Sequence, residues 1–255
     1  PFWSIKRENT FPYQILSRFS PSVQQPREKR GEAAGDRQRM AMLNFLNRWT
    51  GGLNHCGTVP LSTPRLILRR FSLDDTRPMF ENWACDPDVT QYLTWRAHMT
   101  SRETRDVLEY WESQYRRADF YEWAIVPKDY GCPIGSIGMS RLSHSKTSME
   151  LGYCIGKAWW GQGICAEAAE AVLRLMFEEV GCTSVIAMHA LPNTSSGRVM
   201  EKCGMHPKNC PPEPVKTENG LFYCRVYELD RTEYEQRLAC RGRIGVPAGG
   251  WQTGG

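Results

Sequence analysis

The sequence predicts a three-layer α+β domain, with a mixed, mostly antiparallel central sheet and helices on both faces. Apolar residues make up 41% of the 255 residues and charged residues 24%, which is typical of a globular protein with a buried core. Strand patterns come in a run in the first half of the domain and alternate with helical patterns in the second half. Such an order favours a mixed sheet covered on both sides.

The elements follow one another from Thr63 onward. Alternating or β-branched apolar runs bounded by turn residues predict strands at residues 65–71, 123–126, 133–139, 148–155, 184–190 and 221–229. Capping residues followed by apolar residues at helical spacing predict helices that begin near Asp74, near Thr100, after Gly163, at Thr194 and at Arg231. We expect the third helix to run for about five turns before Gly181 ends it, and the last to reach only Leu238.

The whole net charge of +4 lies in residues 1–40, which hold eight Lys and Arg against four acids. We expect an N-terminal extension at residues 1–60, either disordered or partly upstream of a true start at Met40 or Met42. An Arg-rich transit peptide is the alternative. The folded domain is expected at residues 61–240 and a flexible tail at 241–255. A neutral folded domain argues against a nucleic-acid partner.

The ten cysteines form no C-x-x-C pair and have no histidine at ligand spacing, so the sequence predicts no metal site. No secretory signal is visible, and no apolar stretch is long enough to cross a bilayer. We therefore expect a reduced, cytoplasmic protein with no membrane partner.

Residues 149–169 (MELGYCIGKAWWGQGICAEAA) carry the strongest chemical signal: a strand, a short loop, a Gly-x-Gly turn and a helix. Gly161 and Gly163 allow a tight turn that exposes backbone N–H groups, and the positive end of the following helix dipole lies beside them. This arrangement is suited to a pyrophosphate. A nucleotide-binding protein is an alternative, but neither the phosphate-binding Lys nor the third glycine of the dinucleotide fingerprint is present.

Several further motifs occur in a specific order. They are Thr63-Pro64-Arg65-Leu66-Ile67-Leu68-Arg69, Asp86-Pro87-Asp88-Val89 with Tyr92-Leu93, Glu150-Leu151-Gly152-Tyr153, Trp160-Gly161-Gln162-Gly163, and Asn193-x-x-Ser196-x-x-Val199-Met200-Glu201-Lys202-x-Gly204-Met205. With these motifs, residues 62–238 resemble the GCN5-related N-acetyltransferase (GNAT) superfamily, in its ribosomal-protein N-terminal-alanine acetyltransferase branch. The resemblance implies an acyl-CoA N-acyltransferase fold and acetyl-CoA as cosubstrate.

The resemblance also implies roles for individual residues. Backbone around Cys154 and Ile155 would pair with the pantetheine arm of coenzyme A, and Asn193 would contact the same arm. Backbone amides of the glycine turn and first helical turn would hold the pyrophosphate; these belong to Gly161, Gln162, Gly163, Ile164, Cys165 and Ala166. Trp160 and Cys165 depart from the residues usual in the family.

Glu150 is the predicted general base, because an amine must lose a proton before it attacks a thioester. Strand alternation places Glu150, Gly152 and Cys154 on one face of the sheet. Ser196 is predicted to donate to the departing thiolate, since Met200 stands where many members have a Tyr. The alternatives are a solvated or ion-paired Glu150 and a Ser196 that only caps its helix.

A cysteine nucleophile, Cys154 or Cys165, is an alternative mechanism that requires a depressed pKa and a base. We instead expect direct attack in a ternary complex. The acceptor is expected to be the α-amine of a protein such as a ribosomal protein. A small amine, or a non-catalytic acyl-CoA-binding role, is the alternative. Trp95 either lines an acceptor groove or packs within its loop, and the protein is expected to be a monomer or homodimer.

Overall fold

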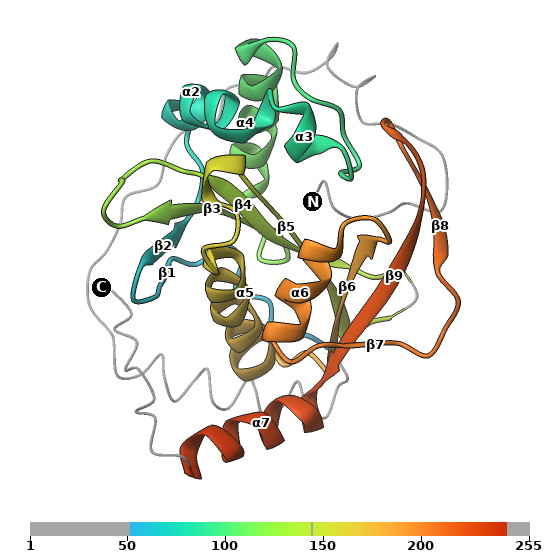
Figure 1. Ribbon diagram of the computed structural model, residues 1–255. Helices are drawn as coiled ribbons and strands as arrows, with labels where there is room; N and C mark the ends of the chain where they lie inside the picture. Colours follow the sequence, from blue (N-terminus) through green and yellow to red (C-terminus); the bar gives the residue numbers. More distant parts are fainter. Residues whose placement is uncertain (1–51, 144, 244–255) are drawn as a thin grey trace, which may run out of the picture.

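The computed structural model describes residues 52–143 and 145–243, which form a single open sheet with helices on both faces (Figure 1). The predictions for residues 1–51 and 244–255 lie outside the described residues. The strands are β1 (Leu61–Ser62), β2 (Leu66–Arg69), β3 (Tyr121–Pro127), β4 (Gly135–Arg141), β5 (Ser148–Ile155), β6 (Ser184–Ala190), β7 (His206–Pro207), β8 (Glu213–Thr217) and β9 (Gly220–Asp230).

The strand order is β1-β2-β3-β4-β5-β6-β9-β7, with β8 paired to the free part of β9. Every pair is antiparallel except β5 with β6. The predicted mixed, mostly antiparallel sheet is therefore confirmed. The single parallel pair arises because a helix connects β5 to β6 and returns the chain to the same edge.

The parallel pair separates halfway along its length. Pairing of β5 with β6 runs only from Ser148–Ser184 to Leu151–Ala187. Beyond that point β5 stays paired with β4 up to Ile155, and β6 stays paired with β9 up to Ala190. The two strands thus diverge in the middle of the sheet, and this gap positions the candidate site.

The helical segments are the 3₁₀ turn η2 (Leu73–Asp75), α2 (Thr76–Met79), the wider turn η3 (Phe80–Ala84), α3 (Pro87–Thr90), α4 (Ser101–Gln114), η4 (Lys157–Trp159), α5 (Ile164–Arg174) with its continuation η5 (Leu175–Val180), α6 (Thr194–Lys202) and α7 (Arg231–Arg243). Thr100 caps α4 by accepting from the Glu103 amide, as its position predicts. The helix after Gly163 runs 17 residues to Val180, where Gly181 adopts the left-handed conformation that ends it.

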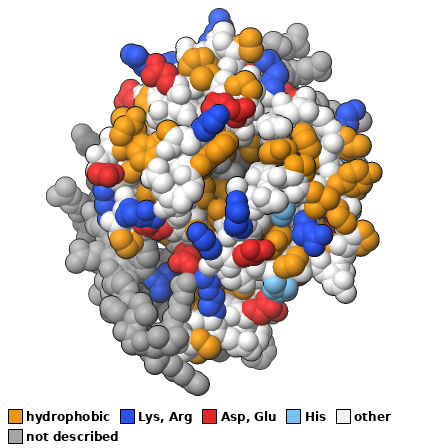
Figure 2. Space-filling model, in the orientation of Figure 1, with side chains coloured by type: hydrophobic (Ala, Val, Ile, Leu, Met, Phe, Trp, Pro, Cys, Tyr) orange, Lys and Arg blue, Asp and Glu red, His pale blue; other side chains and the backbone are white. Residues whose placement is uncertain are grey.

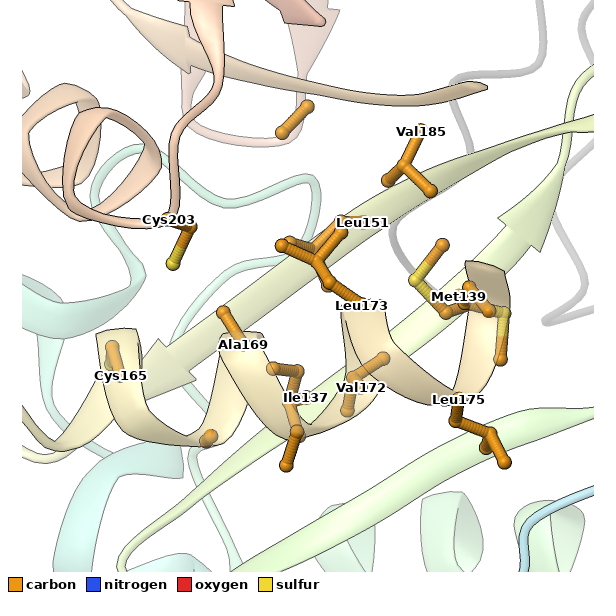
Figure 3. Close-up of a cluster of buried hydrophobic side chains, with 14 of the residues drawn as sticks. Ile137, Met139, Leu151, Cys165, Ala169, Val172, Leu173, Leu175, Val185 and Cys203 are labelled. Atoms are coloured by element: carbon orange, nitrogen blue, oxygen red, sulfur yellow. The ribbon is translucent and has the colours of Figure 1, made fainter. Parts of the chain in front are cut away.

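Helix α5 packs across one face of the sheet, where it meets β4, β5 and β6 (Figure 3). Ala169, Val172 and Leu173 point from the helix toward Ile137 and Leu151 of the strands. Small residues at the helix face allow the close approach, and burial of these apolar side chains away from water stabilises the layer.

The opposite face is covered by the segment from η2 to α4. Trp83, Leu108 and Trp111 pack there against Ala124 and Val126 of β3. Alternate residues of β3, such as Trp123, point to the α5 side. Helices on both faces, as predicted, follow from a central strand that is apolar on both sides.

The structure also contains elements that the sequence pattern did not predict. Strands β1, β7 and β8 were missed, and α7 extends to Arg243 rather than ending at residue 238. Residues 53–59 lie against the main core, where Val59 accepts from the Trp123 indole. Among the described residues, no helix is long and apolar enough to cross a membrane.

Candidate active site

The glycine turn has the geometry of an anion-binding cradle. Gly161 and Gly163 both adopt positive φ angles, of 76° and 75°, which other residues rarely adopt. Helix α5 begins directly after Gly163. Within the described part of the chain, none of the backbone N–H groups from Gly161 to Ala166 donates to a protein acceptor. These donors and the helix dipole are therefore available for an anionic group.

An ion pair between Arg65, which is exposed, and Glu167, which is partly buried, fixes this turn to the first part of the domain. The Glu167 carboxylate, in the first turn of α5, accepts from the Arg65 Nε at 2.6 Å and the Arg65 amide at 2.9 Å. Arg65 in turn donates to the carbonyl of Gln162 at 3.0 Å. Burial alone would raise the pKa of Glu167, but the hydrogen bonds from Thr63 and Arg65 outweigh it and lower the pKa. Through Arg65, the ion pair connects the start of α5 to the backbone of the glycine turn.

The backbone of β5 presents polar groups to the gap at alternate residues. The amide of Gly156 donates at 2.8 Å to the carbonyl of Ile134, the residue directly before β4, so the adjacent Ile155 points its N–H and C=O away from β4. By the same alternation Cys154 points its backbone groups toward β4, and Tyr153 toward the gap. The backbone groups of Ile155 thus face the gap, while those of Cys154 face β4. The indole of Trp160 donates to the Ile155 carbonyl at 2.9 Å.

A cavity of about 100 Å³ lies where β5 and β6 diverge. It is lined by Tyr92, Leu93, Thr94, Glu150, Leu151, Gly152, Tyr153, Met188, His189, Ala190, Asn193, Ser196, Met200, Val215, Thr217, Phe222 and Cys224. The structure thus brings together Glu150, from one predicted motif, and Asn193 and Ser196, from another. Glu150 and Ser196 approach from opposite faces of the sheet, because the gap opens the sheet between them.

Glu150 is 6% exposed. Among the described residues its carboxylate has no hydrogen-bond or ion-pair partner, so the alternative of an ion-paired Glu150 is not supported. Burial, followed by the negative charge of Glu213, raises the pKa of Glu150 to about 7. A carboxyl group with this pKa exchanges protons near neutral pH, as a general base requires.

Asn193 and Ser196 form the start of α6. The Asn193 side chain accepts from the Ser196 amide at 3.3 Å, so Asn193 is the capping residue. The capping alternative for Ser196 is therefore wrong. The Ser196 hydroxyl lies 3.0 Å from the Tyr153 hydroxyl, and both residues line the cavity. A serine hydroxyl in this position has a hydrogen to offer to a group in the cavity.

Neither candidate nucleophilic cysteine has the required environment. Burial, only partly opposed by a contact with Ser136, raises the pKa of Cys154 to about 12. Burial also raises the pKa of Cys165. Both thiols are protonated at neutral pH and lie on opposite faces of the sheet, so they lack the thiolate that an acyl-enzyme needs. This geometry favours direct transfer.

One wall of the cavity was not predicted, because it comes from the β8–β9 hairpin. Val215, Phe222 and Cys224 of this hairpin line the cavity. At its tip, the Asn219 side chain lies 3.0, 3.2 and 2.9 Å from the carbonyl oxygens of Thr90, Leu93 and Trp95. The hairpin is thereby fastened to the loop that supplies Tyr92, Leu93 and Thr94. The Thr217–Gly220 turn signal was present in the sequence, but its partner loop lies more than 120 residues away.

The remaining candidates have packing roles. The Trp95 ring packs against His98 in a tilted arrangement, with ring centroids 5.0 Å apart, and Trp95 is absent from the cavity lining. His189 does line the cavity, but its Nδ1 contacts the Ala190 carbonyl at 2.9 Å and its ring lies against Gly197 of α6. Among the described residues, no group of three or more His, Cys, Asp or Glu side chains is placed to hold a metal ion.

On the face that carries α5 and α6, Lys and Arg side chains lie among Asp and Glu side chains (Figure 2). Among the basic residues, Arg65, Arg198 and Lys202 are exposed. Positive charge beside the glycine turn favours an anionic ligand with several phosphates.

Comparisons with known proteins agree with this geometry. Residues 65–206 match the family model described as an acetyltransferase (GNAT) domain. An uncharacterized N-acetyltransferase, p20 of Bacillus licheniformis, is 23% identical over 68% of this chain and 97% of its own length. The putative ribosomal N-acetyltransferase YdaF of Bacillus subtilis is 28% identical over 48% of this chain and 62% of its own length.

Solved structures show the same fold. A GNAT-family acetyltransferase from Bacillus anthracis has a TM-score of 0.60 at 22% identity and covers 68% of this chain and 99% of its own. A ribosomal-protein α-N-acetyltransferase in complex with coenzyme A has a TM-score of 0.59 at 14% identity and covers 67% and 97%.

The divergent strands and the glycine turn agree with an acyltransferase of the GNAT class. The chain belongs to the GNAT acetyltransferase family, whose model matches more than half of its length. It is an N-acetyltransferase of the GNAT type, and this family uses acetyl-CoA and an amine acceptor.

Proposed function

We propose that the protein transfers the acetyl group of acetyl-CoA to the α-amine of a protein N-terminus, by direct attack while both substrates are bound. The observation that carries the proposal is the cavity at the divergence of β5 and β6, which Glu150 and Ser196 both line.

The cofactor side of the proposal rests on backbone donors. The N–H groups of Gly161, Gln162, Gly163, Ile164, Cys165 and Ala166 bind the pyrophosphate, helped by the dipole of α5. The gap-facing backbone of Tyr153 and Ile155 pairs with the amides of the pantetheine arm, in place of the missing strand partner. Asn193 contacts the same arm from the start of α6.

Glu150 removes the proton of the acceptor ammonium, directly or through a water molecule. Its pKa of about 7 lies close to that of a protein α-amine, about 8, and far below that of a lysine side chain, about 10.4. Proton transfer to Glu150 is therefore uphill by about 1.4 kcal/mol from an α-ammonium and by about 4.6 kcal/mol from a lysine. This match favours an α-amine acceptor.

The cavity wall supports the same acceptor. Its lining is mostly apolar and contains one carboxylate, that of Glu150. A cavity of about 100 Å³ with this lining fits the slender end of an extended peptide better than a polycationic antibiotic, which needs several carboxylates. The relatives described as ribosomal-protein acetyltransferases also favour a protein terminus.

Ser196 donates a hydrogen bond to the sulfur as the thioester breaks. The carbon–sulfur bond electrons leave with sulfur, and a donor in the cavity stabilises the developing negative charge. As the tetrahedral intermediate collapses to the amide, the nitrogen loses its second proton, which goes to the departing thiolate and gives the free thiol of coenzyme A. The first proton, taken from the ammonium before attack, stays on Glu150 until solvent removes it.

The test is a thioester-consumption assay with three sets of acceptors: peptides with free N-termini, the same peptides N-acetylated but with an internal lysine, and small polyamines. We expect free N-termini to be acetylated with the highest kcat/KM. Faster turnover of the blocked, lysine-containing peptides or of the polyamines would contradict the acceptor. Calorimetry that shows tighter binding of ATP than of acetyl-CoA would contradict the cofactor side.

A further inference from the structure

A tyrosine of the cofactor strand crosses the gap to reach the proposed thiolate donor. Tyr153 lies two residues beyond Leu151, the last residue of β5 that pairs with β6. Its hydroxyl oxygen lies 2.9 Å from the Ser196 carbonyl oxygen and 3.0 Å from the Ser196 Oγ. The side chain therefore ties β5 to α6 at the point where the sheet no longer does.

The tyrosine hydroxyl has one hydrogen for two contacts, which allows two arrangements. In the first, Tyr153 donates to the Ser196 carbonyl and the Ser196 hydroxyl donates to Tyr153. In the second, Tyr153 donates to the Ser196 Oγ, and the serine hydrogen is free to point into the cavity. The heavy atoms occupy the same places in both, so rotation of two hydroxyl groups is enough to exchange them.

We propose that Tyr153 is a positioning residue that holds the Ser196 hydroxyl at the cavity and, by donating to its oxygen, turns the serine hydrogen toward the departing sulfur. The inference rests on the proposed role of Ser196. No covalent bond of Tyr153 forms or breaks, and its proton stays on the phenol oxygen.

Two observations support a positioning role. Burial raises the pKa of Tyr153, so the phenol keeps its hydrogen throughout the pH range of an enzyme assay. Across residues 52–143 and 145–243, no other side chain lies within hydrogen-bond distance of the Ser196 Oγ. The orientation of this hydroxyl group thus depends on Tyr153 and on the group in the cavity.

The test compares Tyr153→Phe, Ser196→Ala and the double variant. Phenylalanine keeps the ring packing and removes only the hydroxyl. The matched control is Tyr227→Phe, because the Tyr227 hydroxyl also ties a strand to α6, through Glu201 at 3.1 Å. Single-turnover rates and kcat are normalised to sites that bind CoA, so that a partly unfolded preparation still reports the rate per folded site.

We expect Ser196→Ala to lower kcat by about tenfold or more, because it removes a hydrogen bond to the negatively charged sulfur. We expect Tyr153→Phe to lower kcat by about fivefold, because it removes a hydrogen bond to the neutral Ser196 hydroxyl. The double variant should be no slower than Ser196→Ala alone. The KM for acetyl-CoA should change by less than twofold. The midpoint of the pH–rate profile should not change beyond the error of its measurement. Tyr227→Phe should keep the kcat of the original protein.

The outcomes separate the two proposals. If Ser196→Ala keeps its kcat, the assigned role of Ser196 is wrong. If Ser196→Ala is slow while Tyr153→Phe is not, only the role of Tyr153 is wrong. A loss that is confined to the KM for acetyl-CoA, or a double variant slower than Ser196→Ala, also overturns the positioning role.

Discussion

Replacement of Glu150 by glutamine is expected to stabilise the folded protein at alkaline pH and to remove its activity. Burial, with the charge of Glu213, raises the pKa of Glu150 from 4.5 to about 7. Because the folded protein binds this proton more tightly than the unfolded chain, the free energy of unfolding falls as pH rises from 4.5 to about 7. The cost reaches about 3 kcal/mol above this window.

Glutamine has the shape of the protonated acid and cannot ionise. Glu150→Gln should therefore match the original protein in stability near pH 4.5 and exceed it by up to about 3 kcal/mol at pH 8. Denaturant unfolding at both pH values measures the difference. Glu109→Gln, at an exposed carboxylate that pairs with Arg105 on α4, is the control and should leave the pH dependence unchanged.

The same variant, Glu150→Gln, also tests the role of Glu150 in the rate of acetyl transfer. In the original protein, kcat/KM should rise with pH through about 7, because the base acts only when it is deprotonated. Glu150→Gln should lose about 10²–10⁴-fold in rate. Glu213→Gln should move the midpoint to lower pH, since it removes a negative charge that raises the pKa of Glu150. Near-normal turnover of Glu150→Gln, or equal pH dependence of stability in both proteins, would refute the reasoning.

Three further predictions concern the cradle and the cavity wall. Gly163→Ala should lose about 1–2 kcal/mol of stability through its positive φ and weaken CoA binding in calorimetry. Gly181→Ala, with a φ of 86° at the opposite end of the same helix, should cost similar stability and leave CoA binding intact. Glu167→Ala should raise the KM for acetyl-CoA several-fold, because it releases Arg65, which donates to the Gln162 carbonyl. The midpoint of the pH–rate profile should not change. An unchanged KM would show that the turn keeps its conformation without the ion pair. Asn219→Ala should release the β8–β9 hairpin from the loop at residues 90–95 and so broaden the range of peptides that the protein acetylates. An equal decrease in kcat/KM for every peptide in the panel would contradict this prediction.

Local features were accurate where short-range physics decides the structure. Thr100 caps α4, Gly181 ends the helix that follows the glycine turn, and both glycines of that turn have positive φ. Alternation in β5 correctly placed Leu151 and Cys154 on opposite faces. Each of these follows from residues within one helical turn or one strand, so a single sequence carries the signal.

Long-range features were missed. The segment that forms β8 contains Pro214 and three polar or charged residues, and it becomes a strand only because β9 offers a partner. Strand propensity depends on such neighbours more than on the residue itself. The same holds for Asn219, whose three acceptors lie in a loop far away in the sequence.

By itself, the sequence predicted the family, the strand and the glycine turn that we propose bind the cofactor, and the position of an acid in β5. Tertiary structure decided that β5 and β6 separate after Leu151, that Glu150 is buried without a partner, and that Tyr153 reaches Ser196. The physical reason is that composition and spacing fix the local backbone, whereas desolvation and hydrogen bonding between strands and helices depend on packing that only the complete fold creates.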